Sequence, residues 1–229
     1  MKERVAIYIG IDSRQAGTYD TCKMSIQDYS DIKILPIRLA EMEANGLYWR
    51  QQGQESTEFA YTRFLTPYLK GFYDYAIFCD SDFIWNSDPL EMIELIDPFN
   101  AVSVVQHNIT EDQIKPIKMD GQKQHWYPRK NWSSLMVFNC KHPYVKRLTP
   151  EVVSESPPGY LHELDWAGTS IGNLPRTYNY LVGYYKDIDY PKAIHYTDGG
   201  PWHPGYENCD FADKWYGYKQ RVVDLYGRY

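Results

Sequence analysis

The stretch Ala76-Ile-Phe-Cys-Asp-Ser-Asp-Phe-Ile-Trp85 decides the fold. Together with Tyr75, its apolar part up to Cys79 has the length and composition of a buried strand. Two acidic residues, Asp80 and Asp82, follow at once. Residues two apart in an extended chain point to the same side, so both carboxylates are expected to face one space at the end of this strand.

The spacing of these two carboxylates predicts a metal site. Two carboxylates that face one space repel each other and need a cation or a shared proton. Mg²⁺ and Mn²⁺ prefer oxygen ligands and often also bind substrate phosphates. In open α/β sheets, ligands bind beyond the carboxyl ends of the strands, where Asp80 and Asp82 fall. A polar turn after a strand is the alternative, because Asp-x-Asp alone has low specificity.

Strands and helices alternate along the rest of the chain. Apolar runs predict strands at residues 4–10, 31–38, 75–79, 101–106, 134–139 and 193–196. Capping residues and helical spacing predict helices over about 14–28, 58–69, from 88 onward and over 210–226. This alternation predicts an α/β fold with a mostly parallel central sheet flanked by helices. The polar segment 107–130 has no clear periodicity, and such long loops are usually functional or disordered.

Length and charge restrict the class of protein. With 229 residues, of which 43% are hydrophobic and 24% charged, the chain has the composition of a globular domain. Its net charge of -6 and its lack of basic runs argue against nucleic acid as a partner. No stretch reaches the roughly 20 apolar residues of a membrane span, and the N-terminal residues do not resemble a signal peptide. We therefore expect no integral membrane segment and a cytoplasmic location.

The aromatic and cysteine contents bear on ligands. The chain has 22 Tyr, 7 Trp and 8 Phe, and aromatic faces stack on sugar rings and nucleobases. A Tyr-rich core and surface would explain the same composition. The four cysteines form no Cys-x-x-Cys pair, so a structural zinc site is not expected.

Further polar residues follow the predicted strands or lie near them. Asp12 and Ser13 come after the first strand and could meet a nucleobase or ribose, or only cap a helix. Arg63 could pair with the two carboxylates or a diphosphate, or be solvated. His195 ends a late strand and could be a metal ligand or a structural residue. Near residue 163, two carboxylates could serve as a nucleophile or bind sugar hydroxyls, or mark a solvated helix start.

These pieces, in this order, resemble glycosyltransferase family 8 and related retaining enzymes of the GT-A fold. The likeness covers nearly the whole chain. Residues 58–69 (EFAYTRFLTPYL) look like the family's Arg-bearing helix, and 76–82 like its strand with the Asp-x-Asp motif. Residues 134–139 (SLMVFN) look like its "FNAGV"-type strand, and 195–202 (HYTDGGPW) like its "HxxGxxKPW" loop.

The resemblance implies roles for individual residues. Asp80, Asp82 and His195 become ligands of Mn²⁺ (or Mg²⁺), which bridges the diphosphate of a UDP-sugar. The residues implied for nucleotide binding are Ile11, Asp12, Ser13, Arg63 and Ser81. Those implied for sugar or acceptor binding are Asn139, Glu163, Trp166, Gly200 and Trp202, with Trp166 and Trp202 stacking on a sugar face or packing in the core. Asp165 is the candidate catalytic carboxylate, as a nucleophile or by orienting sugar hydroxyls.

The chain departs from the family pattern at two places. Gly200 stands where the family has a Lys that contacts the diphosphate, in a loop one residue shorter. Glu163-Leu164-Asp165 stands where the family often has Asp-Gln-Asp, so Leu164 falls on the polar position discussed near the anomeric carbon. The pattern resembles a bacterial or viral side branch with "HYTxGGPW" loops.

The sequence thus predicts a metal-dependent glycosyltransferase of the hexosyltransferase type. It would move a sugar from a nucleoside diphosphate, a UDP-sugar by resemblance, to a saccharide or glycan hydroxyl with retention. One domain over residues 1–229 is expected, with a nucleotide-binding part at about 1–106 and an acceptor-side part at about 107–229. The alternatives are a haloacid-dehalogenase-type phosphatase with Asp80 as nucleophile, a non-catalytic carbohydrate-binding domain, and an inverting GT-A enzyme.

Overall fold

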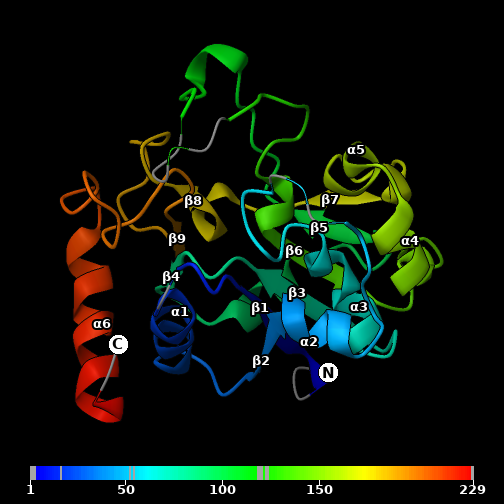
Figure 1. Cartoon of the computed structure of the whole chain (residues 1–229), viewed down its shortest axis with the longest axis horizontal. Coiled ribbons are helices and arrows are strands. Elements are labelled where there is room, and N and C mark those ends of the chain that lie inside the picture. Colours follow the sequence, from blue (N-terminus) through cyan, green and yellow to red (C-terminus); the bar gives the residue numbers. More distant parts are fainter. Residues whose placement is uncertain are drawn as a thin grey trace.

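A twisted sheet of six strands forms the centre of the molecule, in the order β2-β1-β3-β6-β5-β7 (Figure 1). The computed structural model describes residues 4–15, 17–51, 53, 55–117, 121 and 124–227. The strands of this sheet are β1 (Ala6–Ile11), β2 (Lys33–Arg38), β3 (Tyr75–Cys79), β5 (Val102–Val104), β6 (Leu135–Asn139) and β7 (Ile171–Asn173).

The direction of β6 sets the polarity of the site. β1 runs parallel to β2 and to β3, and β5 runs parallel to β7, but β6 is antiparallel to both of its neighbours, β3 and β5. The expected α/β fold with a mostly parallel sheet is therefore confirmed, with one reversed strand. Leu135 at the start of β6 pairs with Cys79, whereas Asn139 at its end pairs with Tyr75. The start of β6, not its end, lies beside Asp80.

A smaller sheet continues from the acidic turn. β4 (Phe83–Trp85) begins directly after Asp82 and pairs antiparallel with β9 (Ala193–His195), which pairs parallel with β8 (Tyr180–Leu181). The pairing of β4 with β9 places His195 opposite Phe83, so the second sheet brings a residue from late in the chain beside the acidic pair.

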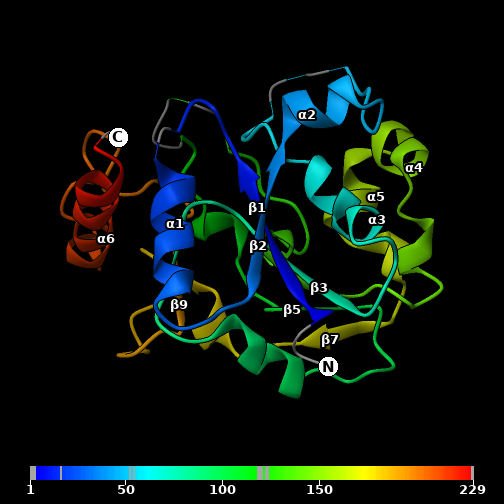
Figure 2. The ribbon, with the colours of Figure 1, turned by 90° about the horizontal axis from the view of Figure 1, so that it is seen from below.

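Helices cover both faces of the main sheet (Figure 2). The α-helices are α1 (Thr18–Gln27), α2 (Leu39–Ala44), α3 (Thr66–Leu69), α4 (Pro150–Glu155), α5 (Pro158–His162) and α6 (Ala212–Tyr226). Short 3₁₀ segments lie at Thr62–Leu65, Pro89–Glu94, Glu111–Gln113, Trp132–Ser134, Val145–Arg147, Asp165–Ala167 and Arg176–Tyr178. Figure 2 shows α1 and α6 on one side of the sheet and α2 to α5 on the other. In the described part of the chain, no helix combines the length and the hydrophobicity that crossing a bilayer requires.

Alternate residues of β1 feed two separate cores. Ala6 and Tyr8 pack into the core on the side of α2 to α5, while Ile7 and Ile9 pack into the core beside α1. Successive side chains of a strand point to opposite faces, so one apolar run can bury both faces of the sheet. This explains why β1 reads as a continuous apolar run.

The helix predicted over residues 58–69 is broken in two. A 3₁₀ turn at Thr62–Leu65 leads into the short α3, with Pro67 in the first turn of α3. Proline has no backbone N–H, so the carbonyl of Arg63 needs another donor. The Thr66 hydroxyl donates to this carbonyl at 2.8 Å, together with the Thr66 backbone N–H. The change from the 3₁₀ turn to α3 thus falls just before Pro67, within the segment predicted as one helix.

Candidate active site

The acidic turn joins the two sheets and is fixed by backbone hydrogen bonds to distant segments. The Asp80 N–H donates to the Ser134 carbonyl at 3.0 Å, and the Tyr196 N–H donates to the Asp82 carbonyl at 3.0 Å. Ser134 precedes β6 and Tyr196 follows β9. Both aspartates are thereby attached to rigid strands, which limits the movement of their carboxylates.

Asp80, Asp82 and His195 come together as the sequence analysis expected. Each offers one ligand atom, and these atoms lie within 4.8 Å of one another. The Nε2 atom of His195 lies 3.4 Å from Oδ1 of Asp82. Two carboxylate oxygens and an imidazole nitrogen fit a divalent cation such as Mn²⁺. The donor set therefore suits the metal that the sequence predicts.

Arg63 supplies positive charge to the same site. It is buried, and Nη1 lies 2.8 Å from Oδ1 of Asp80 and donates to the Ser133 carbonyl at 2.9 Å. The guanidinium also lies over the rings of Phe59 and Phe78, at 5.2 Å from each centroid. Arg63 is thus not a solvated helix residue, and its pairing with the acidic motif matches one of the two roles considered for it.

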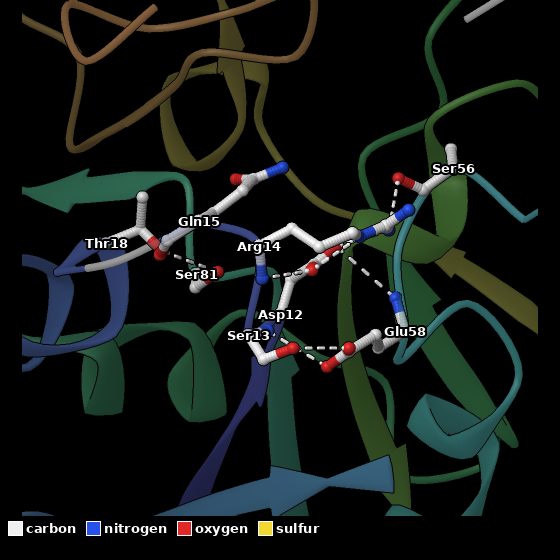
Figure 3. A network of polar contacts seen from close by, with 8 residues as sticks. All are labelled: Asp12, Ser13, Arg14, Gln15, Thr18, Ser56, Glu58 and Ser81. Atoms are coloured by element: carbon white, nitrogen blue, oxygen red, sulfur yellow. Dashed lines mark hydrogen bonds and ion pairs between the residues drawn. The ribbon is translucent and has the colours of Figure 1, made fainter. Parts of the chain in front are cut away.

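The loop after β1 is tied to residues 56–58 by a polar network (Figure 3). Arg14 donates to both carboxylate oxygens of Asp12, at 2.8 and 2.6 Å, and to the Ser56 carbonyl at 3.2 Å. Glu58 accepts from the N–H and the hydroxyl of Ser13, at 2.9 and 2.5 Å. Asp12 and Ser13 therefore use their side chains to hold the loop.

Residues in or next to this network face the cavity. Gln15, Ser56 and Thr57 line the cavity. Ser81 is buried, and its hydroxyl accepts from the Thr18 hydroxyl at 3.2 Å, while Ile11 ends β1. Four residues expected at the nucleotide lie behind the cavity lining and are not part of it: Ile11, Asp12, Ser13 and Ser81.

A cavity of about 450 Å³ opens beside the Asp80–Asp82–His195 cluster. This is within the usual range for pockets that bind small molecules. Tyr127, Lys130, His162 and Glu163 also line this cavity. Lys130 is buried, with Nζ donating to the His125 carbonyl at 3.2 Å and lying 4.8 Å from the centroid of the Tyr127 ring. The cavity therefore combines acidic ligand atoms with the cations of Arg63 and Lys130.

His162 is an uncharged group among these cations. Its Nδ1 lies 3.0 Å from the Ser133 hydroxyl, and its ring contacts Tyr61 and Phe64, each at 5.4 Å between centroids. Burial lowers the pKa of His162 to about 3, and the positive charges of Arg63, Lys130 and Arg50 act in the same direction. The ring therefore stays neutral near neutral pH and can offer a hydrogen bond without a charge.

Comparison with known proteins shows which family the chain belongs to. No protein-family model matches the chain. Protein CDI of Arabidopsis thaliana is 42% identical over 223 residues, which cover 93% of this chain and 85% of that protein. The chain belongs to the same family as Protein CDI.

Solved structures identify the fold. The bifunctional glycosyltransferase WbbM matches with a TM-score of 0.67 at 17% identity, over 100% of this chain and 52% of that one. The glycosyltransferase GlyE of Streptococcus pneumoniae TIGR4 matches at 0.61 and 14%, over 96% and 63%. The galactosyltransferase LgtC, solved with donor and acceptor sugar analogs, matches at 0.61 and 13%, over 94% and 95%. This chain thus has the GT-A glycosyltransferase fold and spans about half of the WbbM chain.

Two residues expected at the site, Asn139 and Asp165, lie elsewhere, the first because of strand direction and the second because of a turn. Asn139 ends the antiparallel strand β6, so it lies at the sheet edge opposite to Asp80, and its amide donates to the Pro98 carbonyl at 2.8 Å. Asp165 is exposed and does not line the cavity, whereas Glu163 does. Leu164 between them is buried with a φ of 58°, and this turn separates the two carboxylates. These two placements correct the expectation from sequence.

The two tryptophans and Gly200 belong to packing. Trp166 is buried and stacks on Phe138, with ring centroids 6.0 Å apart. Trp202 packs against Trp215 at 5.1 Å between centroids. A Cβ on Gly200 would lie 2.0 Å from the Trp202 ring, so only glycine allows the ring to cover this turn. The core-packing alternative therefore describes both tryptophans, and neither they nor Gly200 line the cavity.

Several cavity residues had no signal in the sequence analysis. Asn131, Ser133 and Ser134 line the cavity just before β6. Ser134 begins the strand expected at 134–139, and the other two lie between that strand and the loop expected at 107–130. Asn179 is fully buried and contacts His195. The run of Asn131 and two serines directly before an apolar strand could have indicated the site if the direction of β6 had been known.

Proposed function

We propose that the protein is a metal-dependent glycosyltransferase of the hexosyltransferase type. It moves a sugar from a nucleoside diphosphate, probed first as a UDP-sugar, to a hydroxyl of a saccharide or glycan, with retention of configuration. The observation that carries this proposal is the meeting of Asp80, Asp82 and His195 beside a cavity of about 450 Å³ in a chain with the GT-A fold. The sequence resemblance to retaining enzymes supports the stereochemistry.

Asp80, Asp82 and His195 would hold Mn²⁺ or Mg²⁺. When bound, the cation would neutralise the negative charge that develops on a leaving diphosphate. Arg63 and Lys130 add two buried cations to the same cavity. Positive groups fixed before the reaction stabilise a diphosphate without reorganisation, so these side chains support an anionic donor.

The nucleotide and sugar ends of the donor are assigned to different parts of the chain. Gln15, Ser56 and Thr57 belong to the part at about 1–106, and we assign them to the nucleoside, with Asp12 and Ser13 holding the loop. His162 and Glu163 belong to the part at about 107–229, and we assign them to the transferred sugar. Glu163 then accepts from sugar hydroxyls or serves as the nucleophile of a covalent intermediate, and it replaces Asp165 in that role.

The other functions considered fit this site less well. A phosphatase would use Asp80 as a nucleophile, but Nη1 of Arg63 holds this carboxylate at 2.8 Å beside two further candidate metal ligands. A non-catalytic carbohydrate-binding domain would not need a cluster of two buried or half-buried carboxylates and a histidine. An inverting transferase would share the metal site, and the anomeric configuration of the product separates it from the proposed retaining enzyme.

Free thiols bear on location. Cys22, Cys79, Cys140 and Cys209 are all free, and three of them are buried. Unpaired cysteines are typical of reducing compartments. This supports the proposal that the protein acts in the cytoplasm.

A thermal-shift screen tests the proposed function. The protein is heated with each of a set of nucleotide sugars, with and without Mn²⁺. We expect the melting temperature to rise most when one donor and Mn²⁺ are both present, because the cation would bind the diphosphate of the donor and each ligand would strengthen the binding of the other. If no nucleotide sugar shifts the melting temperature in either condition, the proposed function is wrong.

A further inference from the structure

We propose that Asn179 is a positioning residue of the metal site, because it sets the tautomer and orientation of His195. Asn179 lies between the 3₁₀ turn Arg176–Tyr178 and β8 and is fully buried. Its two amide atoms contact different partners, Ser134 on one side and His195 on the other. The inference rests on the proposed function only in taking the ligand of His195 to be a divalent cation.

The orientation of the Asn179 amide follows from the hydroxyl of Ser134. This hydroxyl donates its single hydrogen to the Asn131 carbonyl, with 2.7 Å between the oxygens. Toward Asn179 it can therefore only accept. The Asn179 atom at 2.9 Å from Ser134 Oγ must then be the donor Nδ2, which leaves Oδ1 facing His195.

The amide orientation in turn fixes the proton on the imidazole ring. Oδ1 of Asn179 lies 2.9 Å from Nδ1 of His195 and can only accept a hydrogen bond. Nδ1 must therefore carry the N–H, and in the neutral ring the lone pair lies on Nε2. Nε2 is the atom that lies 3.4 Å from Asp82 Oδ1, on the side of the proposed cation. The opposite amide orientation would put the N–H on Nε2 and block metal ligation.

The plane of the His195 ring is also fixed. Phe83 stacks on it with a centroid distance of 4.4 Å and an interplanar angle of 17°. His195 is 2% exposed, so water has little access to compete for its nitrogens. A partner on the second ring nitrogen of a metal-binding histidine orients the ring and raises its basicity as a ligand. Asn179 holds that position for His195.

Three variants test this inference. Asn179→Leu removes both hydrogen bonds at similar size. Asn179→Asp keeps an acceptor for Nδ1–H but replaces the N–H donor to Ser134 with an oxygen. Ser25→Ala is the matched control. The buried Ser25 hydroxyl of α1 accepts from the N–H of Trp85 in β4 at 3.0 Å, and it is not among the contacts of His195. The measurements are the Mn²⁺ dissociation constant by calorimetry and the ¹⁵N NMR shifts of the His195 ring in metal-free protein.

We expect Asn179→Leu to weaken Mn²⁺ binding by about 10- to 100-fold. Asn179→Asp should bind Mn²⁺ more tightly than Asn179→Leu, because it keeps the acceptor for Nδ1–H, and Ser25→Ala should lower the melting temperature without changing Mn²⁺ affinity. The ring shifts of the wild type should place the N–H on Nδ1. Wild-type Mn²⁺ affinity in a folded Asn179→Leu variant, or an N–H on Nε2, overturns the inference.

The two proposals fail in different ways. A wild-type protein that binds neither Mn²⁺ nor a nucleotide sugar overturns the proposed function and the metal part of the inference. The NMR shifts are measured without metal, so they still decide whether Asn179 sets the tautomer. A signal for Nδ1–H that is lost in Asn179→Leu supports that role, and an unchanged signal overturns it.

Discussion

The two sides of the cavity are built differently. The metal side takes its ligand atoms from the ends of β3, β4 and β9 and fixes them by strand pairing and by backbone hydrogen bonds at Asp80 and Asp82. The other part of the lining, here called the loop side, takes Tyr127 and Lys130 from a loop, and His162 and Glu163 from the end of the five-residue helix α5. Residues on strands are positioned by the sheet, whereas those on the loop side depend on contacts between segments distant in sequence.

This difference divides the proposed chemistry. The metal side carries charge that must be held in place before the reaction, which suits rigid strands. The loop side carries groups that can form hydrogen bonds with a sugar, among them His162 and Glu163, beside the cation of Lys130. Binding residues on loops vary more readily than residues on strands. We infer that the metal side determines whether transfer occurs, while the loop side determines which sugar is transferred.

The largest effect is expected from Asp80→Asn on the metal side. An amide oxygen is a poorer ligand for a hard divalent cation than a carboxylate. We expect Mn²⁺-dependent turnover to fall at least about 100-fold. Turnover is measured as nucleoside diphosphate release, with circular dichroism to check folding. Wild-type turnover in this variant, or in wild-type protein with excess chelator, would contradict a metal role.

A smaller loss is expected from His162→Ala on the loop side. Removing the ring leaves the Ser133 hydroxyl and a sugar hydroxyl without this partner, which costs about 1–3 kcal/mol, or roughly 10- to 100-fold in kcat/KM. Binding of the nucleoside diphosphate alone should not change, because His162 is assigned to the sugar. His162→Gln retains a neutral hydrogen-bonding group and should recover part of the loss. Equal losses for the nucleotide and the nucleotide sugar would place His162 elsewhere.

The contrast also explains what the sequence could predict. Asp80 and Asp82 follow an apolar run, and alternation along a strand depends only on local sequence. His195 was found by the order of motifs, because its pairing with Phe83 joins residues more than a hundred positions apart. Asn139 was placed wrongly because strand direction is decided by non-local pairing. The contact of Asn179 with His195 had no local sequence signal, because it too depends on how distant segments pack.

The pH dependence of folding stability should show that His162 is neutral in the folded protein. Burial holds the folded pKa of His162 near 3, below its ordinary value of 6.5. Between these pH values His162 is protonated in the unfolded chain but not in the folded protein. Folding stability therefore falls as pH falls from 6.5 to 3. His162→Gln should reduce this slope by at most about 1.4 kcal/mol per pH unit, the effect of one proton.

Urea unfolding at a series of pH values measures this slope. His107 is a useful comparison, because burial also lowers its pKa to about 3 but it does not line the cavity. His107→Gln should reduce the slope by a similar amount, and the double variant should reduce it by both amounts. A slope that His162→Gln leaves unchanged would mean that the ring is protonated as easily in the folded protein as in the unfolded chain.

The smallest effect is expected from Asp165→Ala, and it tests the turn that shapes the loop side. The buried side chain of Leu164 anchors a left-handed residue, a conformation that costs a non-glycine residue about 1 kcal/mol and therefore needs such an anchor. The turn leaves Glu163 at the cavity and Asp165 in solvent. We expect Asp165→Ala to retain turnover within about twofold, whereas Glu163→Ala, losing a hydrogen-bonding carboxylate, should lose about 10-fold or more. If the two variants lose activity equally, Asp165 reaches the sugar during turnover. The loop side must then rearrange around Leu164, whereas the metal side is held in place by its strands.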